Sequence, residues 1–119
     1  MASEGYHEPL ESLPQDVIEY HRMIQSVIEE LQAVDWYNQR AAASKDPQLK
    51  AIVEHNRDEE IEHACMGLEW LRRVSPAWDE NLRQFLFSTG DITTLEHAGE
   101  DGGNGGNASD GSLGLGDLR

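Results

Sequence analysis

The chain has 119 residues and a formal net charge of −14 at pH 7, so it is long enough for one small domain at most. An acidic surface repels phosphate backbones, which argues against binding to nucleic acid. No apolar run approaches the roughly 20 residues of a membrane span, and the polar N-terminus lacks the apolar region of a signal peptide. The single cysteine, Cys65, cannot form a disulfide within the chain, which fits a reducing, cytoplasmic compartment. We predict that Cys65 is a small buried side chain.

The first predicted helix follows a polar segment, residues 1–12, which we expect to be a flexible N-terminus. In "SLPQ", residues 12–15, Ser12 can cap the helix, Pro14 fits its first turn, and Gln15 completes a capping box. We expect this helix to cover about residues 14–43. Its apolar or large side chains recur at the spacing of a packed seam: Val17, Tyr20, Ile24, Val27, Leu31, Val34 and Ala41.

The second predicted helix begins after "SKDPQ", residues 44–48, with Asp46 as its N-cap and Pro47 in its first position. We expect it to run from about residue 47 to residue 73. Its stripe is apolar at both ends and polar in the middle: Leu49, Ile52, Asn56, Glu59 or Glu60, His63, Met66 and Trp70. The sequence "SPAW" at 75–78 starts a shorter third helix that ends near Phe87. The fold class is therefore all-α, an antiparallel two-helix hairpin followed by a short helix.

The composition changes after Gly90. Eight of the 11 glycines lie between residues 99 and 116, so residues 91–111 cannot bury enough apolar area to fold and are predicted to be a disordered linker. The last segment, residues 112–119, restores three leucines. It is either a frayed terminus or a docking peptide tethered by the linker.

The acids in the middle of the two helices converge if the hairpin turns near residues 45–46. Glu30 then lies level with residue 61, between Glu60 and His63, which share one helix face as an i, i+3 pair. Glu59 is spaced i, i+4 from His63 and could replace Glu60. These acids are either solvated, with Arg57 pairing some of them, or they hold a cation, because buried unpaired carboxylates cost several kcal/mol each.

A cation site built this way is incomplete in one chain. Dimetal sites in four-helix bundles take a Glu from each of two helices and a Glu-x-x-His pair from each of the other two. A symmetric dimer closes the bundle and brings two copies of Glu30, Glu60 and His63 together. Carboxylate and imidazole ligands without thiolate suit iron, manganese or zinc. Three hypotheses follow: a redox-active metal centre, a redox-silent divalent site that stabilises a helical assembly, and a helical interaction module with solvated acids.

Two segments carry a resemblance to a known family. "VIEELQAVDWYNQR" and "LKAIVEHNRDEEIEHACMGLEWLRR" resemble encapsulated ferritin, a two-helix ferritin-like protein loaded into encapsulin shells, over about residues 10–90. The resemblance implies that residues 13–90 are a ferritin-like half-bundle that dimerises into a four-helix bundle, and that five dimers form a ring of ten chains. It implies a ferroxidase that oxidises Fe(II) to Fe(III) at a di-iron centre, with iron stored inside the encapsulin.

The family's iron ligands match Glu30, Glu60 and His63. A nearby iron-uptake site uses two acids on the first helix in the family. The first matches Glu29, but the second falls at Gln32, which has no charge, so we expect an altered uptake site here.

Further positions match the family outside the ligand set. Trp36 and Tyr37 match residues close to the metal centre, and spacing alone would make Trp36 a packing residue. The segment "SLGLGDLR" is similar to peptides that dock cargo on the inner wall of an encapsulin, which implies residence in an encapsulin nanocompartment within the bacterial cytoplasm. The targeting positions are Ser112, Leu113, Gly114, Leu115, Gly116, Asp117 and Leu118. Asp117 departs from the family pattern, which favours small or hydroxyl residues there.

Overall fold

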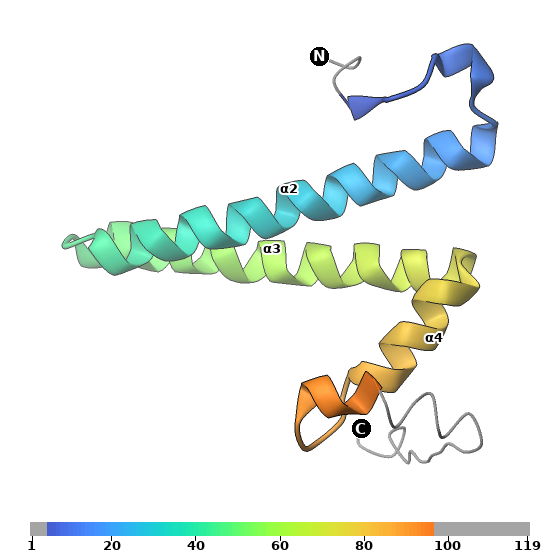
Figure 1. The fold of residues 1–119 in the computed structure, drawn as a ribbon. Helices are drawn as coiled ribbons and strands as arrows, with labels where there is room; N and C mark the ends of the chain where they lie inside the picture. The colour runs from blue at the N-terminus through green and yellow to red at the C-terminus, as the bar shows by residue number, and fades with distance from the viewer. Residues whose placement is uncertain (1–4, 97–119) are drawn as a thin grey trace. The chain divides into compact units, whose positions relative to one another are not determined.

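The computed structural model describes residues 5–96, and within that range the chain is helical with no strand. In order, the elements are η1 (Leu10–Ser12), α2 (Gln15–Ala43), α3 (Pro47–Val74), α4 (Pro76–Phe85) and η2 (Ile92–Thr94). Figure 1 shows α2 and α3 as a long antiparallel hairpin. The chain divides between Val74 and Ser75 into two compact units. The predicted all-α class, with two long helices and one shorter helix, is confirmed. The predicted linker and docking peptide lie outside the described residues, except for the linker's first six residues.

The start of α2 differs from the prediction. Its N-cap is Pro14, which offers no side-chain hydrogen bond. Ser12 belongs to η1, where its backbone N–H donates to the carbonyl of Pro9. The predicted capping box on Ser12 is therefore wrong, because the 3-10 turn places Ser12 before the helix and not at its first N–H groups. The first backbone hydrogen bonds of α2 run from the N–H groups of Val17 and Ile18 to the carbonyl of Pro14, at 3.1 and 3.2 Å.

The other helix starts follow the sequence. The backbone N–H groups of Gln48 and Leu49 donate to Oδ1 of Asp46 at 2.9 and 3.2 Å, so Asp46 caps α3 as predicted. Ser75 caps α4, because its side chain accepts a hydrogen bond from the backbone N–H of Trp78. These two caps fix where the chain turns into each helix.

The seam between α2 and α3 combines small residues with Val27 and Leu71. Its buried residues follow a seven-residue repeat: 14 residues separate Val27 and Ala41 on α2, and intervals of three and four separate Ala64, Gly67 and Leu71 on α3. That repeat keeps one face of each helix against the other along the hairpin. Three predictions of burial are wrong: those for Val17 and Leu31 in the seam and that for Cys65, with Val17 42% exposed at the end of the hairpin away from the turn. Leu31 is 55% exposed, and Cys65 is exposed although it was predicted to be buried, because each lies one residue, or about 100°, beyond a residue that faces the seam.

Most of the stripe predicted for the second helix does not face α2; Glu60 and Trp70 are the members that do. Ile52 and Met66 lie on the same stripe as His63, and they are 53% and 57% exposed in the single chain. The seam runs instead through Glu60, Ala64 and Gly67, one residue further along at each turn. The stripe of Ile52, His63 and Met66 is therefore left uncovered on the hairpin.

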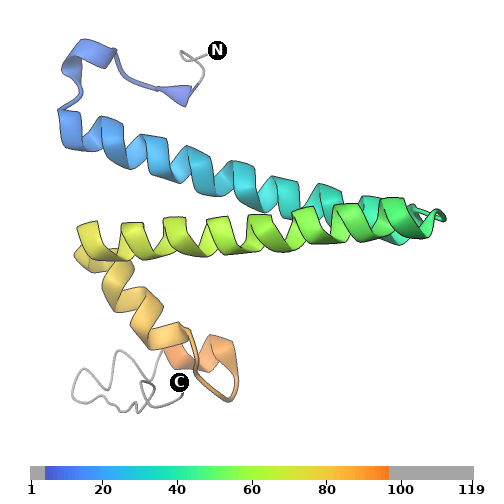
Figure 2. The same cartoon turned by 180° about the vertical axis from the view of Figure 1, so that it is seen from behind.

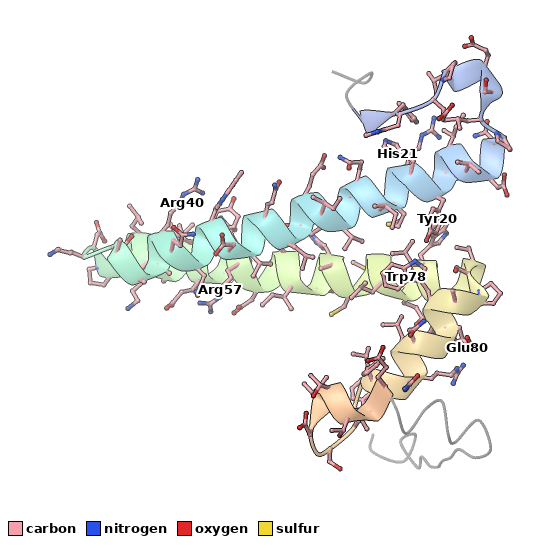
Figure 3. All side chains as sticks on the ribbon, in the orientation of Figure 1. Tyr20, His21, Arg40, Arg57, Trp78 and Glu80 are labelled. Carbon is pink, nitrogen blue, oxygen red and sulfur yellow. The ribbon has the colours of Figure 1, made fainter. Side chains whose placement is uncertain are left out.

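The wider end of the hairpin is lined by larger side chains. Seen from the front and from behind, α2 and α3 separate away from their connecting turn (Figures 1 and 2). Between the separated ends lies a groove of about 300 Å³, lined by Asp16, Val17, Glu19, Tyr20, Trp70 and Val74. On the outer side of α2, His21 points towards the N-terminal segment (Figure 3), where its ring lies 4.2 Å from that of Tyr6, centroid to centroid.

The second unit is small. In α4 an ion pair of 2.8 Å joins Arg83 to Asp79 one turn earlier. The side chain of Gln84 donates to the carbonyl of Leu95, so the segment after α4 folds back on it. Asp91 caps η2 by accepting from the backbone N–H of Thr93. Among residues 5–96 no helix combines the length and the apolar character needed to cross a bilayer.

The ion pairs at the end of α3 make a testable prediction. Arg72 donates to Glu69 at 2.9 and 2.8 Å, and Arg73 donates to it at 2.6 Å. These bonds to Arg72 and Arg73 lower the pKa of Glu69 from 4.5 to about 2. We expect a ¹³C NMR titration of the carboxyl group to place its midpoint near that value. Because the folded-state pKa is below the unfolded one, the pairs stabilise the fold above about pH 4.5, and this contribution is lost as the pH falls through about 2.

The variant Arg73→Gln is the control for that titration. It removes one of the two charged donors, so the midpoint of Glu69 should move up towards 4.5 while Arg72 still holds it below that value. A midpoint near 4.5 in the native protein would contradict the prediction.

Candidate metal centre

Three potential metal ligands meet in the middle of the hairpin. Glu30 comes from α2, and Glu60 and His63 come from α3. Nδ1 of His63 lies 3.4 Å from Oε1 of Glu60 and 3.7 Å from Oε1 of Glu30. One ligand atom from each of the three residues lies within 4.8 Å of the other two. The level match predicted from the hairpin turn therefore brings these three side chains together.

The helix seam explains why the carboxylates converge. Glu30 follows the buried Val27 by three residues, and Glu60 precedes the buried Ala64 by four, so both point towards the facing helix. The side chains of Glu30 and Glu60 are 27% and 24% exposed, and that of His63 is 42% exposed. The two carboxylates thus lie inside the seam, while the imidazole lies at its edge, on the uncovered stripe with Ile52 and Met66.

The two carboxyl groups perturb each other. The hydrogen bond between them raises the pKa of Glu30, and burial and the charge of Glu60 raise it further. The pKa of Glu60 is lowered, because Glu60 accepts that hydrogen bond and a second one from His63. Two carboxylates this close favour holding one proton between them. A cation would replace that proton.

The acidic surroundings of the His63 imidazole raise its pKa. Burial works to lower the pKa of His63, but the hydrogen bond to Glu60 and the charges of Glu30, Glu60 and Glu59 outweigh it, so the pKa is raised. The three groups therefore favour a positive charge among them, whether a proton or a metal cation. A metal ion would have to displace the proton from the ring nitrogen that binds it.

The neighbouring acids are directed elsewhere. Oε2 of Glu59 lies 3.9 Å from Nε2 of His55, one turn away on α3. Glu59 was the alternative to Glu60 on spacing alone, and the structure brings Glu60, not Glu59, into the cluster. Glu29 and Gln32 are exposed on α2, and neither belongs to the three-residue cluster.

Arg57 does not neutralise the cluster. It donates to Oδ1 of Asp58 and, across the hairpin, to Oδ1 of Asn38, each at 3.0 Å. Figure 3 shows Arg40 and Arg57 on the two facing helices towards the connecting turn. Of the aromatic residues that match the family, Trp36 is half exposed, and the Tyr37 ring lies 5.3 Å beneath the guanidinium of Arg40.

The donor set of two carboxylates and one imidazole fits a first-row divalent cation with mixed oxygen and nitrogen ligands. A Glu on one helix and a Glu-x-x-His pair on the next are half of the ligands of a ferritin-like dimetal centre. The hairpin is likewise half of a four-helix bundle. The fold and the ligand set together define a ferritin-like half-bundle.

Comparison with known proteins places the chain within this class. The profile of the EncFtn-like family matches residues 5–89, and the chain belongs to that family. It is 54% identical to "Encapsulated ferritin-like protein" of Rhodospirillum rubrum, over 99% of this chain and 90% of the relative. It is 45% identical to "Ferritin-like protein" of Thermotoga maritima, over 95% of this chain and 96% of the relative.

A solved structure has the same fold. The crystal structure of protein NE0167 from Nitrosomonas europaea superposes with a TM-score of 0.72 at 55% sequence identity, and the match covers 74% of this chain and 98% of that one. The resemblance stated from the sequence is therefore confirmed at the level of the family and of its helical fold.

Proposed function

We propose that this protein is a ferroxidase that oxidises Fe(II) to Fe(III) at a di-iron centre formed between two chains. The observation that carries the proposal is the convergence of Glu30, Glu60 and His63, with ligand atoms within 4.8 Å of one another. Membership of the EncFtn-like family and the ferritin-like names of two relatives support the choice of iron.

Two chains are needed because one chain supplies half of the ligands. A second hairpin placed symmetrically over the stripe of Ile52, His63 and Met66 would close a four-helix bundle and cover side chains that one hairpin leaves exposed. The paired site would contain four carboxylates and two imidazoles. Its formal charge of about −4 would balance two divalent cations. By its family resemblance, we propose that such dimers assemble further into a ring of ten chains.

The ligands suit a change of iron oxidation state. Each Fe(II) loses one electron, and dioxygen accepts the electrons together with protons. Carboxylates favour the higher charge of Fe(III), and Glu30 and Glu60 lie on flexible stems that can change how they bind as the charge of the metal rises. His63 offers a nitrogen ligand on a more rigid side chain. Glu29 would act in iron uptake on the outer side, weakened by Gln32 at the second position.

Anaerobic loading with Fe(II), followed by exposure to air, tests the proposal. We expect ferric absorbance to develop with oxygen consumption, at two irons per pair of chains. A protein that binds Fe(II) but consumes no oxygen would instead have a redox-silent divalent site that stabilises the assembly. A protein that binds no metal would be a helical interaction module with solvated acids.

The C-terminal segment bears on where in the cell the protein acts. We propose that residues 112–119 dock the protein inside an encapsulin nanocompartment, which would store the oxidised iron in the bacterial cytoplasm. One relative is named an encapsulated ferritin-like protein, which supports this partner. The leucines of the segment follow a glycine-rich stretch, which would act as a tether long enough for them to contact a partner at a distance from the helices.

Deleting residues 112–119 should abolish loading into co-expressed encapsulin shells and leave Fe(II) oxidation unchanged, because the deletion is far in sequence from the ligands. Loading is measured by the protein that co-purifies with intact shells. Replacing Leu113, Leu115 and Leu118 by serine keeps the length of the chain and should have the same effect. Loading that survives both changes would rule out this segment as the docking peptide.

A further inference from the structure

A close contact between α2 and α3 lies one turn from the candidate ligands. Gly67 is a glycine inside a long helix, where it costs stability relative to alanine. A Cβ atom placed on Gly67 would lie 2.5 Å from Cγ2 of Val27 and 3.2 Å from Sδ of Met23. No real Cβ comes so close to another carbon. The backbone of α3 therefore touches the side chain of Val27 in a way that only glycine permits.

This contact has a fixed relation to the ligands on both helices. Val27 precedes Glu30 by three residues on α2, and Gly67 follows His63 by four on α3, so they lie about 4.5 Å and about 6 Å along their helices from a ligand. An α-helix transmits a shift of its backbone to the next turn almost unchanged. A change in the separation of the two helices at Gly67 therefore also changes their separation at the cluster.

The Gly67–Val27 contact lies between the open end of the hairpin and the candidate ligands. Beyond Gly67, towards the open end, the helices are separated by the groove that Tyr20, Trp70 and Val74 line. Figures 1 and 2 show the two helices drawing apart in that direction. Along the hairpin, the Gly67–Val27 contact lies between this groove and the cluster of ligands.

We propose that the Gly67–Val27 contact is a positioning element for the metal centre, and that it sets the separation of α2 and α3 at which Glu30 reaches Glu60 and His63. This inference rests on the proposed metal site. Carbon atoms in contact prefer about 3.5–4.0 Å, so a methyl group on residue 67 forces a retreat of about 1 Å. Val27 cannot turn aside easily because β-branched side chains in helices hold one rotamer, whereas the flexible Met23 can move.

Binding of Co(II), a redox-stable substitute for Fe(II), tests this in the full-length protein. We expect Gly67→Ala to weaken Co(II) binding by about tenfold or more, as changes to groups that orient metal ligands do. The double variant Val27→Ala/Gly67→Ala removes the obstructing Cγ2 and should restore the native affinity. Val27→Ala alone loosens the same contact without forcing the helices apart, so it should lower the melting temperature and weaken Co(II) binding less than Gly67→Ala does.

The outcomes separate a positioning role from a purely structural one. If Gly67→Ala lowers only the melting temperature, or if the double variant binds no better than Gly67→Ala, the positioning role is wrong. Should Gly67→Ala fail to fold, Val27→Ile enlarges the same contact from the other side, and native Co(II) affinity in that variant would equally overturn the inference. If the native protein bound no Co(II), the proposed metal site itself would fail, which is a different result from native binding with unaffected variants.

Discussion

We expect the replacement of Glu60 by alanine to lower the rate of the proposed Fe(II) oxidation by about 100-fold or more, because the loss of outer partners of metal ligands already costs 10–100-fold in affinity or activity. Glu60 contributes an oxygen to the cluster from within the seam, where its carboxyl group interacts with both Glu30 and His63. In a paired site each substitution removes two ligands, one from each chain. The measurement is the initial rate of ferric absorbance after anaerobic Fe(II) loading, together with the iron bound per chain.

Glu59→Ala is the matched control for that variant. It removes the same group from the adjacent position of the same helix, yet Glu59 lies beside His55 and outside the three-residue cluster. We expect its oxidation rate to stay within about threefold of native, since substitutions away from special sites have small effects. Equal losses in the two variants would show that the acidity of the helix matters and not the ligand position. A larger loss in Glu59→Ala would mean that Glu59 is the ligand.

His63→Ala should be as damaging as Glu60→Ala, because the imidazole is the single nitrogen donor of the cluster. His63→Gln offers a neutral oxygen ligand of similar reach, and we expect it to recover part of the iron binding but not the native rate. Iron stoichiometry and rate are therefore measured on the same samples.

The sequence predicted the elements of this fold well, for local reasons. Proline and aspartate mark the turn at residues 46–47, and the serine-proline pair at 75–76 marks the next helix, since caps and fixed proline dihedrals act over a few residues. The expected second helix, residues 47–73, differs from α3 by one residue at its end. The position of the turn also determines which residues of the two helices lie level, and so it predicts that Glu30 lies next to Glu60 and His63.

The rotation of each helix about its axis was harder to predict. Leu31 was placed in the seam and Glu30 beside it, whereas the structure has Glu30 in the seam. The sequence carries apolar residues on two neighbouring stripes, and one residue is only 100° of rotation. The choice between the stripes depends on how closely the backbones approach. Gly67 permits that close approach. A single glycine within a predicted helix is the feature of the sequence that indicates it.

The same two stripes explain the error at Cys65. Small and apolar character suggested burial, but Ala64 and Gly67 occupy the narrow seam and leave Cys65 outside it. A hairpin of two helices has only one intramolecular seam. The second apolar stripe, with Ile52 and Met66, is available for another surface.

Replacing Ile52 by glutamate should separate the paired chains and abolish iron binding, although Ile52 lies about 12 Å along α3 from Glu60 and cannot act as a ligand there. Ile52 is 53% exposed in the single chain and lies on the stripe of His63 and Met66. In a symmetric pair the substitution places two carboxylates in a covered interface, and each unpaired buried charge costs several kcal/mol. Size-exclusion chromatography with light scattering measures the assembly, and iron bound per chain measures the site.

Ala51→Glu tests whether position, and not charge, causes that loss. It adds the same carboxylate to the adjacent residue of α3, which is exposed and lies about 100° around the helix from the stripe. We expect its mass in solution and its iron stoichiometry to match those of the native protein. If Ile52→Glu separated the chains yet left two irons bound for every two chains, each hairpin would hold metal alone, and the shared centre would be wrong. If it changed neither property, the partner chain would have to cover a different face. Loss of both properties in Ile52→Glu alone would tie metal binding to the stripe that carries His63, because that stripe is where the second set of ligands must approach.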